Sequence, residues 1–273
     1  MMADLSPFRE HRLAPHWRLG TTSCVFESDM VTNVRQLAAS AEDIELVLYE
    51  TPEQNNWPSP EEYRELRRLQ EEFGLSYTVH IPSHIGCVTC DRAWEDWTYS
   101  MVERAVSVFA DLRPVAYVWH WEAEHFGPRP ADDMRHWRAA LSRLAERVAS
   151  APWTDPQMFA VETLSYPFEL IEDLVASYGF SVTFDVGHLW RGGFDWESLW
   201  ERCGDYVKVV HLHGIDAAGR DHKSLEYQSV SQIARLAELL RHRRLAADKV
   251  VTLEVFSQED WQSSRRVWTE HFR

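Results

Sequence analysis

Residues 181–188, Ser-Val-Thr-Phe-Asp-Val-Gly-His, form a short run of apolar and β-branched side chains that ends in an aspartate and a histidine. Such a run predicts a buried strand of a parallel sheet. Residues 206–213 repeat this design, because an apolar run there ends in His211-Leu212-His213. Alternate residues of a strand share a face, so these two histidines are expected to point the same way. The fold should therefore gather polar side chains where its strands end.

The whole chain contains eight such runs, and stretches with helical periodicity separate them. The expected strands are residues 17–23, 43–50, 76–81, 116–121, 158–162, 181–185, 206–213 and 250–256. This alternation in a chain of 273 residues predicts one (β/α)8 TIM barrel of the α/β class. An open doubly wound sheet is the alternative, but it usually has a glycine-rich phosphate turn after its first strand. Here that strand ends in Thr21-Thr22-Ser23-Cys24, and the chain contains no GxGxxG motif.

The expected helices carry start and stop signals. Ser59-Pro60-Glu61-Glu62 is a capping box with proline at the first helical position, and Gly74 ends that helix just before the third strand. Later helices have apolar stripes that should face the barrel. The stripes are Val102, Ala105, Val106 and Phe109; Leu141, Leu144 and Val148; and Ile233, Leu236, Leu239 and Leu240.

No low-complexity linker or change in composition divides the chain. Residues 17–273 are therefore expected to form one domain, and residues 1–16 an N-terminal arm. No apolar run approaches the ~20 residues that span a bilayer, which predicts a cytoplasmic protein without membrane insertion. Four scattered cysteines are typical of a reducing compartment. The role of Cys87-Val88-Thr89-Cys90 stays open, because this CxxC motif has no partner pair.

The chain is strongly acidic, with 28 basic residues, 43 acidic residues and a net charge of −15. A field of that sign repels polyphosphate, so nucleic acid is not an expected partner. The composition leaves the oligomeric state open.

The expected strands three to eight all end in side chains that can bind metal. These are His80, His120, Glu162, Asp185 with His188, His211 with His213, and Glu254. One histidine at a strand end is commonly a structural residue, but that does not explain six successive strands. In a (β/α)8 enzyme these ends converge on the active site, where buried carboxylates without a cation would take up protons. Mixed histidine and carboxylate ligands predict a divalent metal, Zn²⁺ or else Mn²⁺ or Fe²⁺.

The loop after the seventh strand, residues 214–223, is either a solvated turn or a loop that donates ligands. Asp221 and His222 are its candidate contributors, and Lys223 would meet an anionic oxygen of the substrate. His213 would line the pocket beside the substrate. Trp190 would stack on a flat part of it.

The order of these residues resembles the metal ligands of the xylose isomerase-like TIM barrels. That group includes sugar isomerases and epimerases and the endonuclease IV type of AP endonuclease. Four stretches resemble more specifically the cobamide-remodelling hydrolases of the CbiR type. They are residues 18–23 (RLGTTS), 45–50 (ELVLYE), 184–190 (FDVGHLW), and 211–214 (HLHG) with 221–225 (DHKSL). Those enzymes act on corrinoids and cleave the bond between the phosphate and the ribose of the lower ligand.

The resemblance implies a centre with more than one metal ion, in which Glu162 bridges two of them. The three implied ligand sets are His80 and His120 with Glu162; Glu162, Asp185, His211 and Glu254; and His188 with Asp221 and His222. The third set departs from the endonuclease pattern, which has one residue between the aspartate and the histidine where this chain has none. The resemblance therefore predicts the third metal less directly than the first two.

Two activities fit these residues. In a phosphodiester hydrolase acting on a small-molecule corrinoid, Glu162 or Glu254 would take the proton of the attacking water. In a sugar isomerase or epimerase, one metal would be bound by four of the residues, and the two glutamates would exchange protons with a carbon of the substrate. A corrinoid-binding protein without activity is a third alternative, but it leaves the full set of ligands without a role.

Overall fold

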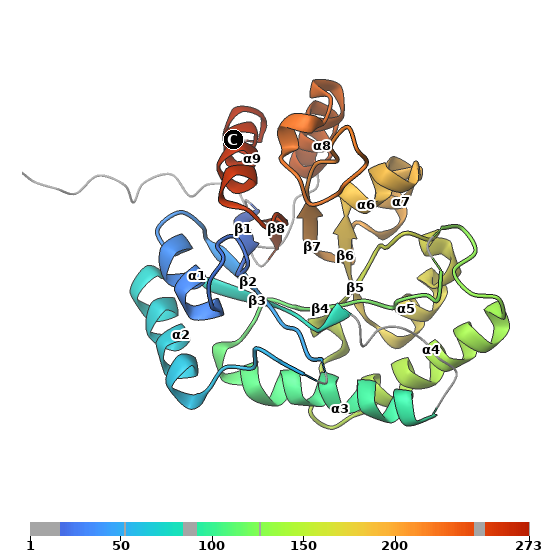
Figure 1. Cartoon of the computed structure of the whole chain (residues 1–273). Helices are drawn as coiled ribbons and strands as arrows, with labels where there is room; N and C mark the ends of the chain where they lie inside the picture. The colour runs from blue at the N-terminus through green and yellow to red at the C-terminus, as the bar shows by residue number, and fades with distance from the viewer. Residues whose placement is uncertain (1–16, 52, 84–91, 126, 243–248, 273) are drawn as a thin grey trace, which may run out of the picture.

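The computed structural model describes residues 17–51, 53–83, 92–125, 127–242 and 249–272. Eight parallel strands pair in chain order and close into a barrel, since the last strand also pairs with the first (Figure 1). The strands are β1 Arg18–Thr22, β2 Asp43–Val47, β3 Ser76–His80, β4 Tyr117–Trp119, β5 Phe159–Glu162, β6 Ser181–Asp185, β7 Val207–Leu212 and β8 Val250–Leu253. The predicted (β/α)8 barrel is confirmed. The strand expected at residues 181–185 has the predicted bounds, and the other seven are shorter than expected.

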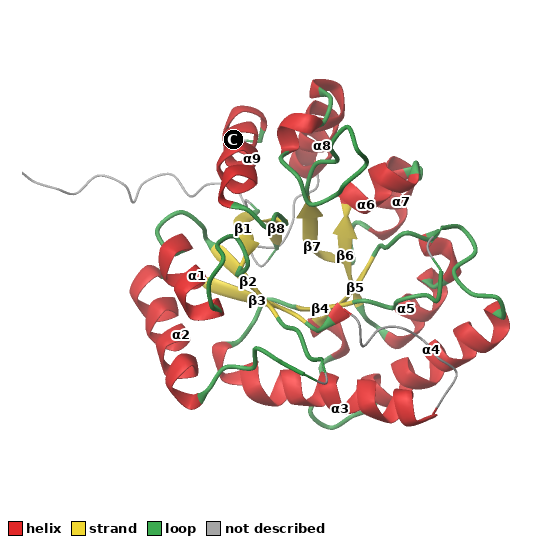
Figure 2. Cartoon of the chain, in the orientation of Figure 1, coloured by secondary structure: helices red, strands yellow, loops and turns green. Residues whose placement is uncertain are grey.

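Helices surround the strands on the outside of the barrel (Figure 2). The α-helices are α1 Met30–Leu37, α2 Pro60–Phe73, α3 Arg92–Phe109, α4 Met134–Ala149, α5 Glu172–Tyr178, α6 Val186–Gly192, α7 Trp196–Cys203, α8 Val230–His242 and α9 Gln258–His271. Short 3-10 turns are η2 Ala110–Leu112, η3 Pro156–Met158, η4 Phe168–Leu170 and η5 Leu225–Tyr227. The β6 segment leads directly into α6, so Asp185 ends the strand and also caps the helix.

Helix α2 shows how the sequence sets the helix ends. The Ser59 hydroxyl accepts from the Glu62 amide, and the Glu62 carboxylate accepts from the Ser59 amide, which is the predicted capping box. Gly74 follows the helix with φ +67°, a left-handed conformation that glycine adopts without a steric cost. Both predicted signals are confirmed.

Most of the apolar core lies between the strands and the helices. The predicted stripes face it, because Val102, Ala105 and Phe109 of α3 and Leu144 of α4 are buried there. A separate, smaller cluster of apolar residues lies inside the barrel. It consists of Ala116, which directly precedes β4, Val118 of β4, Ala160 of β5 and Val209 of β7. Val118, Ala160 and Val209 lie two residues before His120, Glu162 and His211, so this cluster lies on the same face of the strands as those polar side chains.

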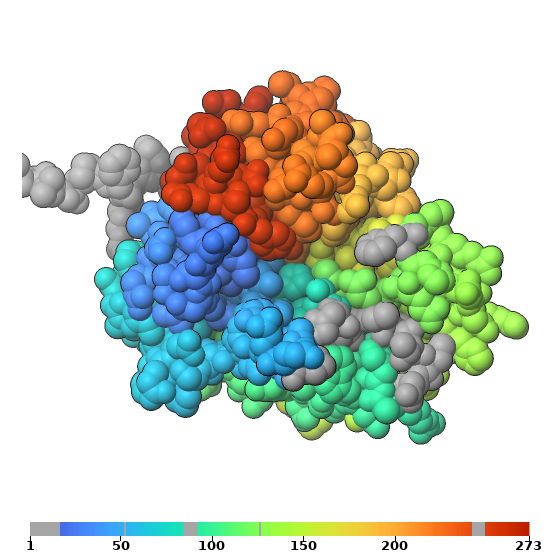
Figure 3. All heavy atoms as spheres, in the orientation of Figure 1, coloured from blue at the N-terminus to red at the C-terminus, as the bar shows by residue number. Residues whose placement is uncertain are grey.

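The first and last strands, β1 and β8, lie side by side. Arg18 pairs with Val250 and Thr21 with Leu253, and the red segment lies against the blue one in the space-filling view (Figure 3). The expected arm at residues 1–16 and the Cys87–Cys90 motif lie outside the described residues. Cys24 and Cys203 are free thiols. None of the described helices combines the length and the apolar character that crossing a membrane requires.

Candidate metal centre

Glu162, the last residue of β5, lies at the middle of the polar cluster and is 1% exposed. Its Oε2 atom is 2.9 Å from Nε2 of His120 and 3.6 Å from Nε2 of His80. Its other oxygen, Oε1, is 3.3 Å from Nδ1 of His211. One carboxylate therefore faces imidazoles on both of its oxygens, which is the arrangement needed to bridge two cations.

His211 lies at the middle of the second group of candidate ligands. Its Nδ1 is 3.2 Å from Glu254 Oε2 and 3.8 Å from Asp185 Oδ2. The ligand atoms of Glu162, Asp185, His211 and Glu254 all lie within 4.8 Å of one another, and all four side chains are buried. The same limit holds for the first group, His80, His120 and Glu162. The structure thus brings together all the residues that were predicted for the first two metals.

The imidazoles in these two groups are held by the ring nitrogen that points away from Glu162. This second contact fixes the ring and selects the nitrogen that can bind a cation. The contacts are His80 Nδ1 to the Ile81 carbonyl at 2.9 Å, His120 Nδ1 to Glu122 Oε1 at 2.9 Å, and His211 Nε2 to Glu45 Oε2 at 2.9 Å. The nitrogens that remain are His80 Nε2, His120 Nε2 and His211 Nδ1, and all three face Glu162.

Glu45 and Glu122 were not among the residues that the sequence predicted for the site. Glu45 lies within β2 and is fully buried between the apolar residues Ile44 and Leu46. A charged residue in the middle of an apolar strand was the available signal, because a buried carboxylate needs a partner. Glu122 follows β4 two residues after His120, so its contact with that ring is local.

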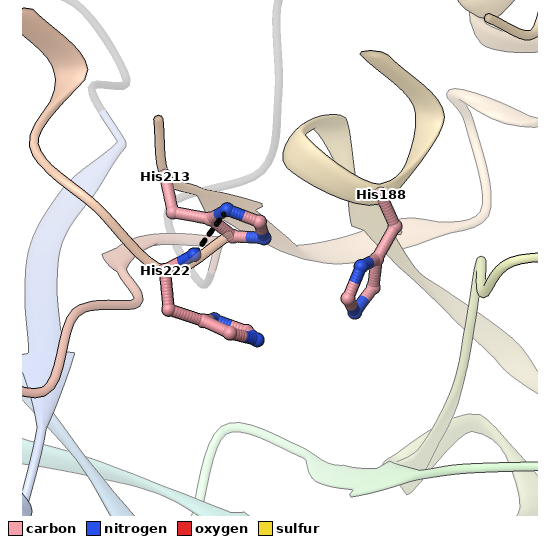
Figure 4. Close-up of side chains that lie close together, drawn as sticks. All are labelled: His188, His213 and His222. Carbon is pink, nitrogen blue, oxygen red and sulfur yellow. Dashed lines mark hydrogen bonds between the residues drawn. The ribbon is translucent and has the colours of Figure 1, made fainter. Parts of the chain in front are cut away.

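A third cluster consists of His188 from α6 and two residues at the ends of the loop after β7, His213 and His222 (Figure 4). Figure 4 shows the rings of His213 and His222 on one side and that of His188 on the other, and the centroid of the His188 ring lies 5.3 Å from that of His213 and 5.5 Å from that of His222. His188 Nε2 is 3.9 Å from Glu162 Oε1, and His222 Nδ1 is 3.4 Å from Glu254 Oε2. This cluster therefore adjoins the first two.

Asp221, expected in the third ligand set, is not part of the cluster that the structure forms there, and it has a protein partner, as do the expected substrate contacts Lys223 and Trp190. Asp221 is paired with Arg191 and lies 3.8 Å from His188 Nδ1. The Lys223 ammonium is 3.5 Å from Asp260 Oδ2 in α9, and the Trp190 ring packs edge-on against Trp196 with 6.3 Å between centroids. Their roles toward a substrate stay predictions.

The electric field of the centre favours positive charge. Burial alone would lower the pKa of His120, but the carboxylates of Glu162 and Glu122 outweigh it and raise that pKa to about 10. The pKa of His222 rises to about 9, since Glu254 outweighs burial in the same way. Burial would raise the pKa of Glu162, yet His120 and His211 hold it well below its usual range. The buried carboxylate of Glu162 therefore stays charged and requires cations beside it.

The donor set fits divalent metal. Within the described part of the chain, Glu45 Oε1, Asp185 Oδ2 and Glu254 Oε2 are buried and have no hydrogen-bond partner. Such oxygens are costly unless a cation meets them. A mixture of imidazole and carboxylate donors suits Zn²⁺, Mn²⁺ or Fe²⁺ better than Mg²⁺ or Ca²⁺.

The fold and this cluster define the class: a TIM barrel with candidate metal ligands at the carboxyl ends of its strands. The model of the xylose isomerase-like TIM barrel family matches residues 35–271, and the chain belongs to that family. The family is enzymatic and commonly binds divalent metals. No curated protein matches the chain in sequence.

Several solved structures share the fold at low identity. Endonuclease IV from Thermus thermophilus is 19% identical, with a TM-score of 0.65 over 93% of this chain and 99% of that one. L-ribulose 3-epimerase is 17% identical, with a TM-score of 0.63 over 92% and 87% of the two chains. D-allulose 3-epimerase from Methylomonas sp. is 18% identical, with a TM-score of 0.61 over 94% and 92%. At these identities the likeness concerns the fold.

Proposed function

We propose that this chain is a metal-dependent phosphodiester hydrolase whose centre holds at least two divalent cations, Zn²⁺ being the first candidate. The observation that carries the proposal is Glu162, whose two oxygens face separate groups of ligands. His80 and His120 would complete one site. Asp185, His211 and Glu254 would complete the other.

The cations would supply Lewis acid chemistry, polarising phosphoryl oxygens and lowering the pKa of water. The residues of the chain would hold and orient the reacting groups. Glu254 would accept the proton of the attacking water through the carboxylate oxygen that does not bind metal. Burial would raise its pKa, but His211 and His222 hold the pKa well below its usual range, so this carboxylate is ionised. Glu162 keeps the two ligand groups at a fixed separation.

The proposed substrate is a cobamide, with cleavage between the phosphate and the ribose of its nucleotide loop. Two features support it: the four stretches that resemble cobamide-remodelling hydrolases, and the net charge of −15, which disfavours a polyanionic nucleic acid. The test is to incubate metal-loaded protein with cobalamin and follow loss of the lower ligand by absorbance and mass. No release with Zn²⁺, Mn²⁺ or Fe²⁺, under oxidising or reducing conditions, would overturn the cobamide proposal.

A sugar isomerase or epimerase is the second candidate. It is favoured by the group Glu162, Asp185, His211 and Glu254, which forms a complete metal site and includes two glutamates that could serve as acid and base. His80 and His120 would then contact the substrate. Metal analysis separates the two candidates, since two or more ions per chain favour hydrolysis and one Mn²⁺-preferring site favours epimerisation.

A further inference from the structure

His213 differs from the other two histidines of the third cluster in how its ring is bound. It is fully buried, and its Nδ1 accepts the backbone N–H of His222 over 3.0 Å (Figure 4). A backbone amide can only donate, so this Nδ1 carries a lone pair and no proton. In a neutral imidazole the proton then lies on Nε2, which is buried, lies 3.3 Å from Asp185 Oδ1 and has no hydrogen-bond partner among the described residues. A protonated Nε2 has no lone pair for a cation, so with Nδ1 accepting the His222 N–H neither nitrogen of His213 binds metal.

The carbonyl of Gly214 is the rival partner of the same ring atom, at 3.4 Å from Nδ1. A proton on Nδ1 would point to that carbonyl and would leave Nε2 free for metal. The two arrangements exclude each other, because a protonated Nδ1 would meet the N–H of His222. The shorter contact, from an amide whose hydrogen position the backbone fixes, favours the unprotonated Nδ1.

The contact holds a strained part of the loop after β7. His222 has φ +52°, a left-handed conformation that residues with a side chain rarely adopt. The neck of the loop is closed by two backbone bonds, Gly214 N–H to the Lys223 carbonyl at 2.6 Å and Lys223 N–H to the Gly214 carbonyl at 3.1 Å. The bond from His222 to the His213 ring is the third contact at this neck, and it fixes the residue that carries a candidate ligand.

The place of the ring depends on Gly187 in α6. A Cβ atom at that position would lie 2.1 Å from Cε1 of His213, so any larger residue would displace the ring. The ring is thus held between a helix that presents no side chain there and the neck of the loop.

We propose that His213 is a positioning residue: through Nδ1 it holds His222 in its left-handed conformation beside the metal centre, and it binds no cation itself. A cation in the third cluster would be bound by His188 and His222 with the adjoining carboxylates. The expected metal content of the variants depends on the proposed metal centre, whereas the contact between His213 and the His222 amide does not.

Two matched substitutions separate positioning from ligation. His213→Asn keeps an acceptor where Nδ1 lies and removes Nε2, whereas His213→Gln places its polar group near Nε2 and removes the acceptor at Nδ1. The measurements are metal ions per chain by elemental analysis and hydrogen exchange of the His222 amide. We expect His213→Asn to keep the metal content and the slow exchange of the wild type. We expect the amide to exchange roughly fivefold to tenfold faster in His213→Gln.

Ligation by Nε2 predicts the reverse: His213→Asn would lose one metal ion per chain and His213→Gln would retain it. Either of these results, with the variant folded by circular dichroism, overturns the proposal. Gly187→Ala serves as a second variant, because it displaces the ring while His213 is kept, and it should accelerate exchange as His213→Gln does. A wild-type protein that binds no metal would refute the proposed function, while the exchange measurement would still decide the role of His213.

Discussion

Glu45 Oε2 lies 2.9 Å from Nε2 of His211, and this contact determines which nitrogen of His211 faces the candidate metal ligands. The Nε2–H group donates to the carboxylate of Glu45. Nδ1 then faces Glu162 and Glu254, at 3.3 and 3.2 Å, and its lone pair would be offered to a cation bound between them. A carboxylate behind a ligating histidine fixes the tautomer of the ring and raises its basicity.

Substitution of Glu45 should therefore weaken metal binding without removing a ligand that the sequence predicted. Glu45→Leu leaves the buried Nε2–H without an acceptor, and we expect affinity to fall about 10- to 100-fold. Glu45→Gln keeps an acceptor oxygen and should lose less. Competition with a chromogenic chelator measures both. Asp43→Asn, two residues earlier in β2, is the control, and a wild-type affinity in Glu45→Leu would show that the contact has no such role.

Glu162→Gln should have the largest effect of any single change in the centre. A neutral amide cannot bridge two cations as a carboxylate does, so we expect at least one metal ion per chain to be lost and turnover to fall by at least about a hundredfold. Elemental analysis and the cobalamin assay check this, and circular dichroism should show an intact fold. Glu122→Gln is the matched control, because it preserves an acceptor for His120 Nδ1. Retained activity in Glu162→Gln would remove Glu162 from the mechanism.

Metal affinity should rise with pH up to about pH 9 to 10. In the metal-free centre the pKa of His120 is raised to about 10 and that of His222 to about 9, so both imidazoles are protonated at neutral pH. A cation must displace these protons, and each one released increases the apparent affinity about tenfold per pH unit. Calorimetry at pH 7 in buffers of different ionisation enthalpy counts the protons. A buffer-independent heat would contradict the prediction.

The barrel and the main ligands could be predicted from sequence because both follow local rules. Short apolar runs mark parallel strands, and the active site of a (β/α)8 barrel lies at their carboxyl ends. Reading the residue at each end therefore finds Glu162 and Asp185 without any knowledge of distances. The structure confirms these positions, since Glu162 ends β5 and Asp185 ends β6.

The finer assignments depend on contacts between distant residues, which periodicity does not report. Glu45 meets His211 across 166 positions of the chain. Lys223 faces Asp260 of α9, a contact that depends on how that helix packs against the loop. The proposed role of His213 depends on the left-handed backbone of His222, a conformation that no local sequence motif predicts here. Sequence therefore identifies which residues belong to the centre more readily than which ring nitrogen of each histidine faces a cation.

Asp43 leads to a prediction about stability that is separate from metal binding. It begins β2, is fully buried, and accepts from the Ser76 hydroxyl over 2.6 Å, and burial raises its pKa to about 6. An unfolded aspartate has a pKa of about 3.9, so between about pH 4 and 6 the folded chain retains a proton that the unfolded chain has lost. The free energy of unfolding then falls as pH rises through this window and is level above it.

Asp43→Asn removes this penalty while keeping an acceptor for Ser76. A gap of about two pKa units corresponds to at most about 3 kcal/mol, so the stability of the variant relative to wild type should increase by up to that amount between pH 4 and pH 7. Urea unfolding of both proteins across this range measures the difference. Asp29→Asn is a control of opposite sign: hydrogen bonds from Thr32 lower the pKa of Asp29, so its contribution is present above about pH 4 and lost below. If the difference between Asp43→Asn and wild type does not change with pH, the buried carboxyl of Asp43 is ionised throughout and its charge is balanced within the barrel.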